Sequence, residues 1–322
     1  MNIRLVLLIL CSLASLPAGA ADIFPSKTVR VVVPFAAGGS TDILARNVAQ
    51  RLNETWKQPV IVDNRAGGGG IIGSELVAKA PPDGYTLLVG TVTTHAVSAS
   101  LYRKLPFDPA RDFAPITEFA SIPQLLSVHP SIPVRSVKEL VALAKARPGQ
   151  FNYGTAGAGS ASHMAMALFE STAKVKMVHV PYKGTGPALV DLLGGHLDLM
   201  FDVILTSLPH MQAGKLRTLG VSSLKRSAVT PDVPTIAESG YPGFEAIVWF
   251  GFFAPAGTPP EVVRKVNEDT ARALRSPKMR EVLAAQGLDV VASSPADFAG
   301  RVASEIAKWR KVIQETGIKL DY

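Results

Sequence analysis

Three glycine-rich segments constrain the fold of this chain more than any other feature of its sequence. They span 34–42, 65–74 and 154–160. Each follows a short run of β-branched or aromatic residues and precedes a stretch with helical spacing. Glycine turns that lead from a strand into a helix are typical of α/β proteins, in which parallel strands alternate with crossover helices. The sequence therefore predicts an α/β fold.

The alternation of strands and helices occurs twice along the chain. The first hundred residues predict strands at 28–33, 60–62 and 86–89, with helices at 43–52 and 73–80. After about residue 120, strands are expected at 125–128, 151–153, 178–180, 199–201, 216–221 and 248–253, and helices at 137–145, 164–171 and 188–193. Residues 261–322 have amphipathic helical spacing, and we expect them to close the first sheet.

The length of the chain also predicts two units. A chain of 322 residues is long enough for about two domains of roughly 100–200 residues. We expect the chain to cross between two α/β lobes near residues 120 and 250. The first lobe would hold 21–121 and 248–322, the second 122–247, and a ligand cleft would lie between them.

Residues 1–20 have the features of a secretory signal peptide. Arg4 supplies a positive charge, an apolar run follows, and Ala18-Gly19-Ala20 presents small residues for cleavage after Ala20. The alternative is a membrane anchor, but an apolar run of about a dozen residues is shorter than the roughly 20 that span a bilayer. Because the single cysteine, Cys11, lies in this segment, the mature chain would have no thiol chemistry. We expect a periplasmic protein.

The charge balance narrows the range of partners. The net charge is +7, from 33 Lys and Arg against 26 Asp and Glu, which favours anionic ligands. The basic residues do not alternate with aromatic ones, so we expect no nucleic-acid binding.

The glycine segments suggest how an anion would be bound. The N–H groups of a helix N-terminus attract anions, and glycine allows close approach of the backbone. Ser40, Thr41 or Asp42 is suitable as the cap of the first helix. The first and third segments would come from different lobes and could face each other across the cleft. The alternative is that these glycines only make tight turns.

Other signatures are weaker. The middle segment satisfies G-x-G-x-x-G through Gly68, Gly70 and Gly73, but no acidic residue ends the next strand, which argues against dinucleotide binding. His196, Asp198 and Asp202 could suggest a metal site, but apolar residues alternate with them, as in a strand. We expect no metal and no cofactor.

Two polar residues of the predicted second lobe are also candidates for contact with a ligand. Asp202 follows an apolar strand and is placed to meet an amino or hydroxyl group of a ligand. His163, in the helix after the third segment, would either line the cleft or face solvent.

Five motifs give the chain a resemblance to a known family. They are Val33 to Asp42, Asp63 to Gly70, Pro82 to Thr86, Val180 to Gly184 and Ala254 to Pro259. In this order they resemble the Bug/TctC family, the periplasmic solute-binding proteins of tripartite tricarboxylate transporters. The resemblance covers the mature chain and implies a type II periplasmic-binding-protein fold, a small carboxylate ligand and no catalysis.

The resemblance also implies a set of ligand-binding residues. The first lobe would contribute Phe35, Ala36, Ala37, Gly38, Gly39, Thr41, Thr93 and Thr94. The second lobe would contribute Ala156, Gly157, Ala158, Gly159, Ser160 and Asp202, with His163 added from its position. Neither loop contains Lys or Arg, so backbone groups would hold the carboxylate.

The functional expectation is therefore a monomeric binding protein for a small organic carboxylate, such as a di- or tricarboxylate, an acidic amino acid or an aromatic carboxylate. Its partners would be membrane transporter subunits. Two alternatives stay open: a ligand-sensing subunit for a membrane kinase, and a secreted α/β enzyme that acts on a carboxylate. The enzyme would need a nucleophile paired with a base, and the sequence shows none.

Overall fold

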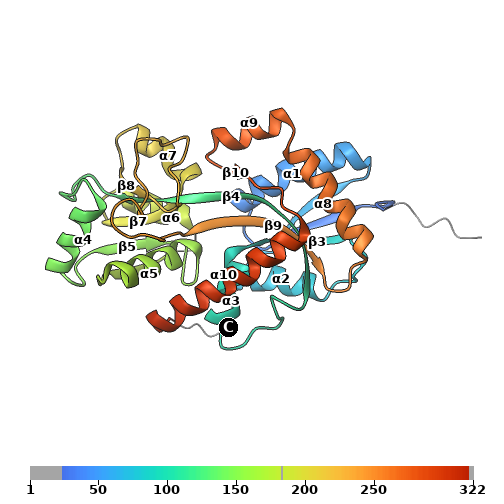
Figure 1. Ribbon diagram of the computed structural model, residues 1–322, viewed down its shortest axis with the longest axis horizontal. Coiled ribbons are helices and arrows are strands. Elements are labelled where there is room, and N and C mark those ends of the chain that lie inside the picture. Colours follow the sequence, from blue (N-terminus) through green and yellow to red (C-terminus); the bar gives the residue numbers. More distant parts are fainter. Residues whose placement is uncertain (1–23, 183, 319–322) are drawn as a thin grey trace, which may run out of the picture.

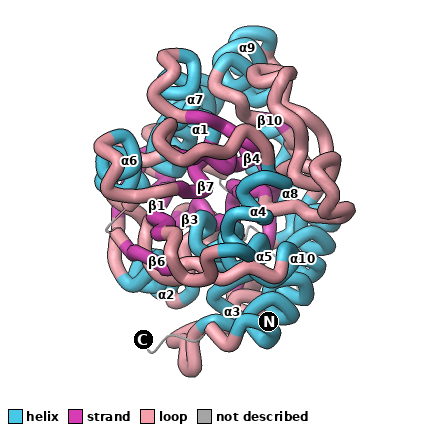
Figure 2. Tube along the Cα trace, turned by 90° about the vertical axis from the view of Figure 1, so that its left-hand side faces the viewer, coloured by secondary structure: helices cyan, strands magenta, loops and turns pink. Residues whose placement is uncertain are grey.

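A ten-stranded sheet, curled and covered by helices, forms the centre of the molecule (Figures 1 and 2). The computed structural model describes residues 24–182 and 184–318. The strands are β1 Val29–Val33, β2 Val60–Asn64, β3 Thr86–Thr91, β4 Phe113–Val128, β5 Asn152–Thr155, β6 Val178–Pro181, β7 Leu199–Val203, β8 Arg217–Val221, β9 Ile247–Pro255 and β10 Asp289–Val290.

The predicted helices are present, and the structure adds α3 and α7, which the sequence did not predict. The α-helices are α1 Ser40–Trp56, α2 Ile71–Ala78, α3 Ser98–Leu101, α4 Val137–Ala146, α5 Ala161–Ala173, α6 Thr185–Leu193, α7 Ile204–Gln212, α8 Pro260–Leu274, α9 Pro277–Ala285 and α10 Pro295–Thr316. Two further helical turns are η2 Gly68–Gly70 and η3 Thr93–Val97.

Two sets of parallel strands lie on either side of two long antiparallel strands. The sheet order is β2-β1-β3-β9-β4-β7-β5-β6. Strands β1, β2 and β3 belong to what we call the first lobe, and β5, β6 and β7 to the second. The long strands β4 and β9 pair with each other over Phe113–Pro123, and β4 then pairs with β7 over Gln124–Val128. Both lobes therefore share β4, as Figure 1 shows.

The register along β4 shows which edges of the two lobes face each other. The last residue of β3, Thr91, pairs with Phe250 of β9, which pairs with Ala120 of β4. The last residue of β7, Val203, pairs with Gln124 of β4. Because β3 and β7 run in opposite directions, their carboxyl ends point toward each other, four residues apart along β4. At about 3.3 Å per residue, this interval is roughly 13 Å.

Burial explains why the strands are so apolar. All nine residues of β9 are buried, and four of the five in β1 are. A strand covered by helices on both faces of its sheet is apolar throughout rather than alternating.

The structure extends two predicted elements. The expected strand 125–128 is the end of the 16-residue β4, whose register shifts after Pro115 and after Glu118. The C-terminal helices do cover the first lobe, but α10 also packs on α5 of the second lobe, where Ser171 Oγ donates to a carboxylate oxygen of Glu315 at 3.1 Å. Figure 1 shows α10 crossing from one half of the molecule to the other.

Gly251 allows α10 to approach β9, which gives a first prediction. A Cβ atom at Gly251 would overlap the ring of Phe298 and lie 2.6 Å from the carbonyl oxygen of Thr117. Phe298 is fully buried against Trp249 and Phe253. We expect Gly251→Ala to lower the free energy of unfolding by about 3 kcal/mol, measured by urea denaturation, because overpacking of a core forces strain.

The matched control is Gly300→Ala on the exposed face of α10, where a Cβ would meet nothing within 4 Å. Alanine is the better helix former, so this variant should gain up to about 1 kcal/mol. If Gly251→Ala unfolds at the urea concentration of the wild type, the close approach of α10 and β9 is not required.

Candidate functional site

The segment after β1 lies open at the carboxyl edge of the first lobe. Ala36, Ala37, Gly38 and Gly39 are exposed, Phe35 is half-buried and Thr41 is buried. The residue that caps α1 is Gly39, so the prediction of a cap at Ser40, Thr41 or Asp42 was wrong. These three residues form the first turn, in which N–H groups have no carbonyl partner within the helix. The first turn of α1 thus holds backbone N–H groups at the carboxyl edge of the first lobe.

A buried carboxylate fixes the shape of this segment. The carboxylate of Asp42 accepts hydrogen bonds from the N–H of Gly38 at 2.9 Å, from Nδ2 of Asn64 at 2.9 Å and from Nε of Arg46 at 3.0 Å. Gly38 has φ +82°, a left-handed conformation that favours glycine. Its N–H is therefore used within the loop.

The ionisation of Asp42 follows from these partners. Burial alone raises the pKa of this carboxyl, but the hydrogen bonds from Arg46, Gly38 and Asn64 outweigh it and lower the pKa below its usual range. Asp42 is therefore ionised, and its stabilising bonds are complete, at every pH well above 4.

Residues 63–65 support the segment after β1 through further hydrogen bonds and ion pairs. Asn64 Nδ2 also donates to the carbonyl oxygen of Phe35, at 3.1 Å. Asp63 pairs with Arg30 of β1 and with Arg65, the residue that follows β2. Asn64 is a residue that sequence reasoning missed as a support of the site, although its motif was recognised.

The middle glycines pack beneath the first segment. A Cβ at Gly70 would lie 2.6 Å from Cγ2 of Thr94 and 3.3 Å from Cζ of Phe35. Gly70 itself has φ +98°. The glycines of η2 thus let the segments after β1, β2 and β3 meet at one edge of the sheet.

Thr93 and Thr94 lie in η3, directly after β3. Thr93 is half-buried, whereas Thr94 is 2% exposed. The Thr94 hydroxyl accepts from the N–H of Thr91 at 2.9 Å and lies 2.9 Å from Nδ1 of His95. As ligand contacts both threonines remain predictions, and the hydroxyl of Thr94 is bound within its own lobe.

In the second lobe, the segment after β5 is held largely by its own side chains. The N–H groups of Ala156, Gly157 and Gly159 donate to Ser162 Oγ, Thr155 Oγ1 and His163 Nδ1. The hydroxyl of Ser160 caps α5 by accepting from the N–H of His163. Ala158 is the exposed member of the segment. The first turn of α5, which follows Ala158, adds N–H groups that have no carbonyl partner within the helix.

His163 does not face solvent, and its place in the cleft wall remains a prediction. It is 5% exposed, and its ring lies against the ring of His179 rather than against solvent. Thr155 and His179, which bind each other at 2.7 Å, are supports that sequence reasoning missed. The available signal was that Thr155 lies in the third glycine segment and His179 in a predicted strand.

Asp202 lies within β7 rather than after it, because the pairing with β4 continues to Val203. It is fully buried, and its Oδ2 accepts from the hydroxyls of Thr206 and Ser207 at 2.5 and 2.9 Å. Burial raises the pKa of this carboxyl, and the two hydrogen bonds only oppose that rise in part. Within the described residues its Oδ1 has no hydrogen-bond partner.

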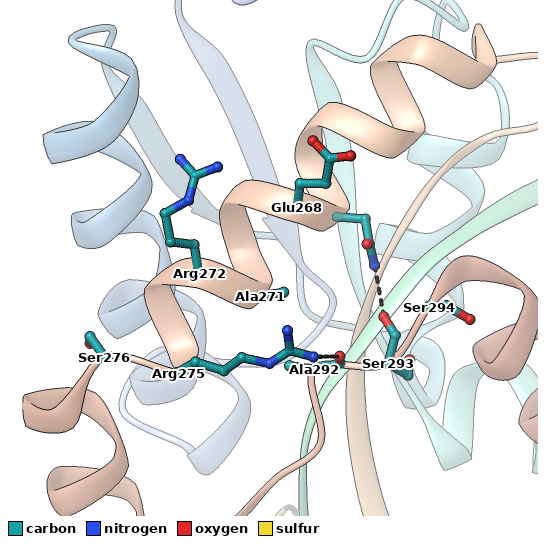
Figure 3. A pocket seen from close by; sticks show the side chains of 9 residues that line it. Glu268, Ala271, Arg272, Arg275, Ser276, Ala292, Ser293 and Ser294 are labelled. Atoms are coloured by element: carbon teal, nitrogen blue, oxygen red, sulfur yellow. Dashed lines mark hydrogen bonds between the residues drawn. The ribbon is translucent and has the colours of Figure 1, made fainter.

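Two hollows in the described part of the chain lie away from these segments. One, of about 760 Å³, lies between the end of α8 and residues 292–294; the other, of about 570 Å³, lies between residues 99–112 and α10. In the first, Arg275 extends toward Ala292 and donates to its carbonyl oxygen, while Arg272 points away (Figure 3). Neither hollow includes a predicted ligand-binding residue.

Within the described residues, no three His, Cys, Asp or Glu side chains gather as metal ligands would. None of the described helices combines the length and apolar character needed to cross a bilayer. The predicted signal peptide at 1–20 lies outside the described residues.

Comparison with known proteins decides the family. The model of the tripartite tricarboxylate transporter family receptors, TctC, matches residues 44–318. The chain belongs to the TctC family. A curated relative, the protein BugT of Bordetella pertussis, is 40% identical over 301 residues, which cover 93% of this chain and 92% of BugT.

Solved structures of the family agree with the fold. Rpa4515 of R. palustris, with adipate, is 41% identical, covers 93% of this chain and all of its own, and superposes with a TM-score of 0.86. MatC from Rhodopseudomonas palustris, with bound malate, is 38% identical, covers 90% of this chain and all of its own, and has a TM-score of 0.82. The predicted α/β periplasmic-binding-protein fold and the resemblance to Bug and TctC proteins are confirmed.

Proposed function

We propose that this TctC-family protein captures a small carboxylate between its two lobes in the periplasm and delivers it to the membrane subunits of a tripartite tricarboxylate transporter. The observation that carries the proposal is the register along β4, which turns the carboxyl ends of β3 and β7 toward each other across roughly 13 Å. Ligands of open α/β sheets bind at the carboxyl ends of strands.

The chemistry of the two edges supports a carboxylate. The first turns of α1 and α5 supply N–H groups and the positive ends of two helix dipoles. One ligand carboxylate would lie against the segment 35–41 and the first turn of α1, and Ala158 with the first turn of α5 would close over it. Adipate and malate, the ligands of two relatives, carry two carboxylates each. This favours a dicarboxylate as the ligand here.

Asp202 would set the preference at the other end of the ligand. Its unpartnered Oδ1 can accept a hydrogen bond from a hydroxyl or amino group, and because burial raises the pKa of this carboxyl, a protonated Asp202 could donate to a carboxylate. In the proposed site, residues 93–94 and 156–160 line the sides of the space that the ligand occupies.

The proposed division of the chain keeps residues 21–121 and 248–322 in the first lobe and 122–247 in the second. A transporter partner is favoured over a sensor kinase by the family alone. A catalytic role is disfavoured because the family and its solved relatives are binding proteins.

A thermal-shift screen tests the function. Adipate, malate, succinate, citrate, aspartate, nicotinate and terephthalate would each be added to the purified protein, and the consumption of every hit would be assayed. At 100 times its Kd, a ligand stabilises the native state by about 2.7 kcal/mol. We expect a rise in Tm with at least one carboxylate and no turnover. The proposal fails if none raises the Tm, or if a hit is consumed.

A further inference from the structure

Two side chains hold the turn of the segment after β5. The N–H of Gly159 donates to Nδ1 of His163 at 3.0 Å, and the N–H of Gly157 donates to Oγ1 of Thr155 at 3.2 Å. Gly157 and Gly159 have φ +122° and +75°, conformations that L-residues other than glycine rarely adopt. The backbone between them, with the exposed Ala158, is therefore set by two side-chain acceptors, one at the end of β5 and one in the first turn of α5.

The ring of His179 joins the two acceptors. It stacks on the ring of His163 with a centroid distance of 4.0 Å and an interplanar angle of 8°. Its Nε2 lies 2.7 Å from Oγ1 of Thr155, and Tyr153 stacks on it at 5.2 Å. Displacement of either histidine ring would therefore disturb the hydrogen bonds of both the Gly157 and the Gly159 N–H groups.

The bond to Gly159 depends on the protonation state of His163. A neutral imidazole has one acceptor nitrogen, and an imidazolium has none. Because Nδ1 accepts from Gly159, the proton of the neutral ring is on Nε2. A second proton on Nδ1 would turn the hydrogen bond into a contact between two donors.

The surroundings keep the rings neutral. Burial lowers the pKa of His163 to about 4, with a smaller contribution from the neighbouring His179, whose own pKa burial also lowers. The other titratable groups at the stack are Tyr153 and Glu170, which share a hydrogen bond at 3.3 Å. Burial raises the pKa of each, and Lys176 opposes the rise at Glu170.

We propose that His163 and His179 are positioning residues for the segment 156–160, which keeps its ligand-binding form only while the ring of His163 is neutral. The inference rests on the proposed function only for the identity of this segment as part of the ligand site. In this role the two histidine rings hold the segment in place and do not need to contact the ligand.

The test uses nuclear magnetic resonance of the ¹⁵N-labelled, ligand-free protein together with two substitutions. His163→Asn keeps an acceptor near the position of Nδ1 but does not titrate, and His163→Leu removes the acceptor. His196→Asn, at an exposed histidine, is the control. At pH 7 we expect Nδ1 of His163 to carry no proton. The Gly157 and Gly159 amide resonances should move less in His163→Asn than in His163→Leu.

Acidification provides the second readout. In the wild type the two glycine resonances should move together with the titration of His163, with a midpoint near pH 4, and they should not move in His163→Asn. A proton on Nδ1 at pH 7 would overturn the proposal, as would glycine resonances that ignore both the titration and His163→Leu. These results need no ligand, and the wild-type titration decides the matter even if the leucine variant does not fold.

Binding of adipate gives an independent check. At pH 7 we expect His163→Leu to bind at least 10-fold more weakly than His163→Asn, and equal affinities would contradict the positioning role. Protonation of adipate affects both proteins equally, so it does not change the ratio of wild-type affinity to His163→Asn affinity. We expect this ratio to fall about twofold at pH 4, because the His163 ring is then protonated in half of the wild-type molecules, which cannot bind. If the wild type binds neither adipate nor malate, the choice of ligand fails, while the resonance data still test the histidines.

Discussion

Gly39→Val is expected to abolish carboxylate binding and to leave the fold intact. Gly39 is exposed, has φ −78° and caps α1, and a Cβ there would meet only the carbonyl oxygen of Ala36, at 3.7 Å. A β-branched side chain would project into the space where an anion approaches the first turn of α1. We expect affinity to fall by at least about 100-fold, or roughly 2.7 kcal/mol, in calorimetric titration with the best carboxylate of the thermal screen.

Gly300→Val on α10 is the matched control, since Gly300 is exposed, a Cβ there would meet nothing within 4 Å, and the residue is not in the proposed site. This variant should bind like the wild type. Affinity retained by Gly39→Val would exclude the first turn of α1 as the site of the carboxylate.

Asp42→Ala is expected to lower both stability and binding. The substitution removes three hydrogen bonds at a residue that is 3% exposed. It leaves the N–H of Gly38 without its acceptor, and Asn64 Nδ2 keeps only its bond to the carbonyl oxygen of Phe35. An unsatisfied buried polar group costs about 1–3 kcal/mol, so we expect a loss of about 2–4 kcal/mol in the free energy of unfolding by urea. Because the segment 36–39 would no longer be held, affinity should fall at least 10-fold.

Asp232→Ala, at an exposed loop carboxylate, controls for the change in net charge and should alter neither quantity. Asp42→Ala with unchanged affinity would show that the segment keeps its binding form without the buried carboxylate.

Local pattern was enough to predict the alternation of strands and helices, because both have regular periods. It was not enough for β4, whose 16 residues include Pro115 and Pro123 and two shifts of register. Proline cannot donate a hydrogen bond within a sheet, and the strand continues past both prolines because β9 pairs with it from far along the chain.

Local pattern also predicted only part of the candidate site. Glycine patterns indicated the two segments, but not that Asn64 would reach Asp42, 22 residues away, or that α1 would begin after Gly39. For His163 the sequence offered a cleft wall or a solvated surface, and the structure places it against the N–H of Gly159 and the ring of His179. Each of these contacts depends on tertiary packing, which spacing along the chain does not encode.

The most direct test of capture between the lobes follows backbone amide resonances during a titration with the tightest-binding carboxylate. We predict that Thr41 in the first turn of α1 and Ala158 after β5 shift together and saturate with one Kd. Shifts confined to one lobe, or to residues around the hollow at Arg275, would contradict capture between the lobes.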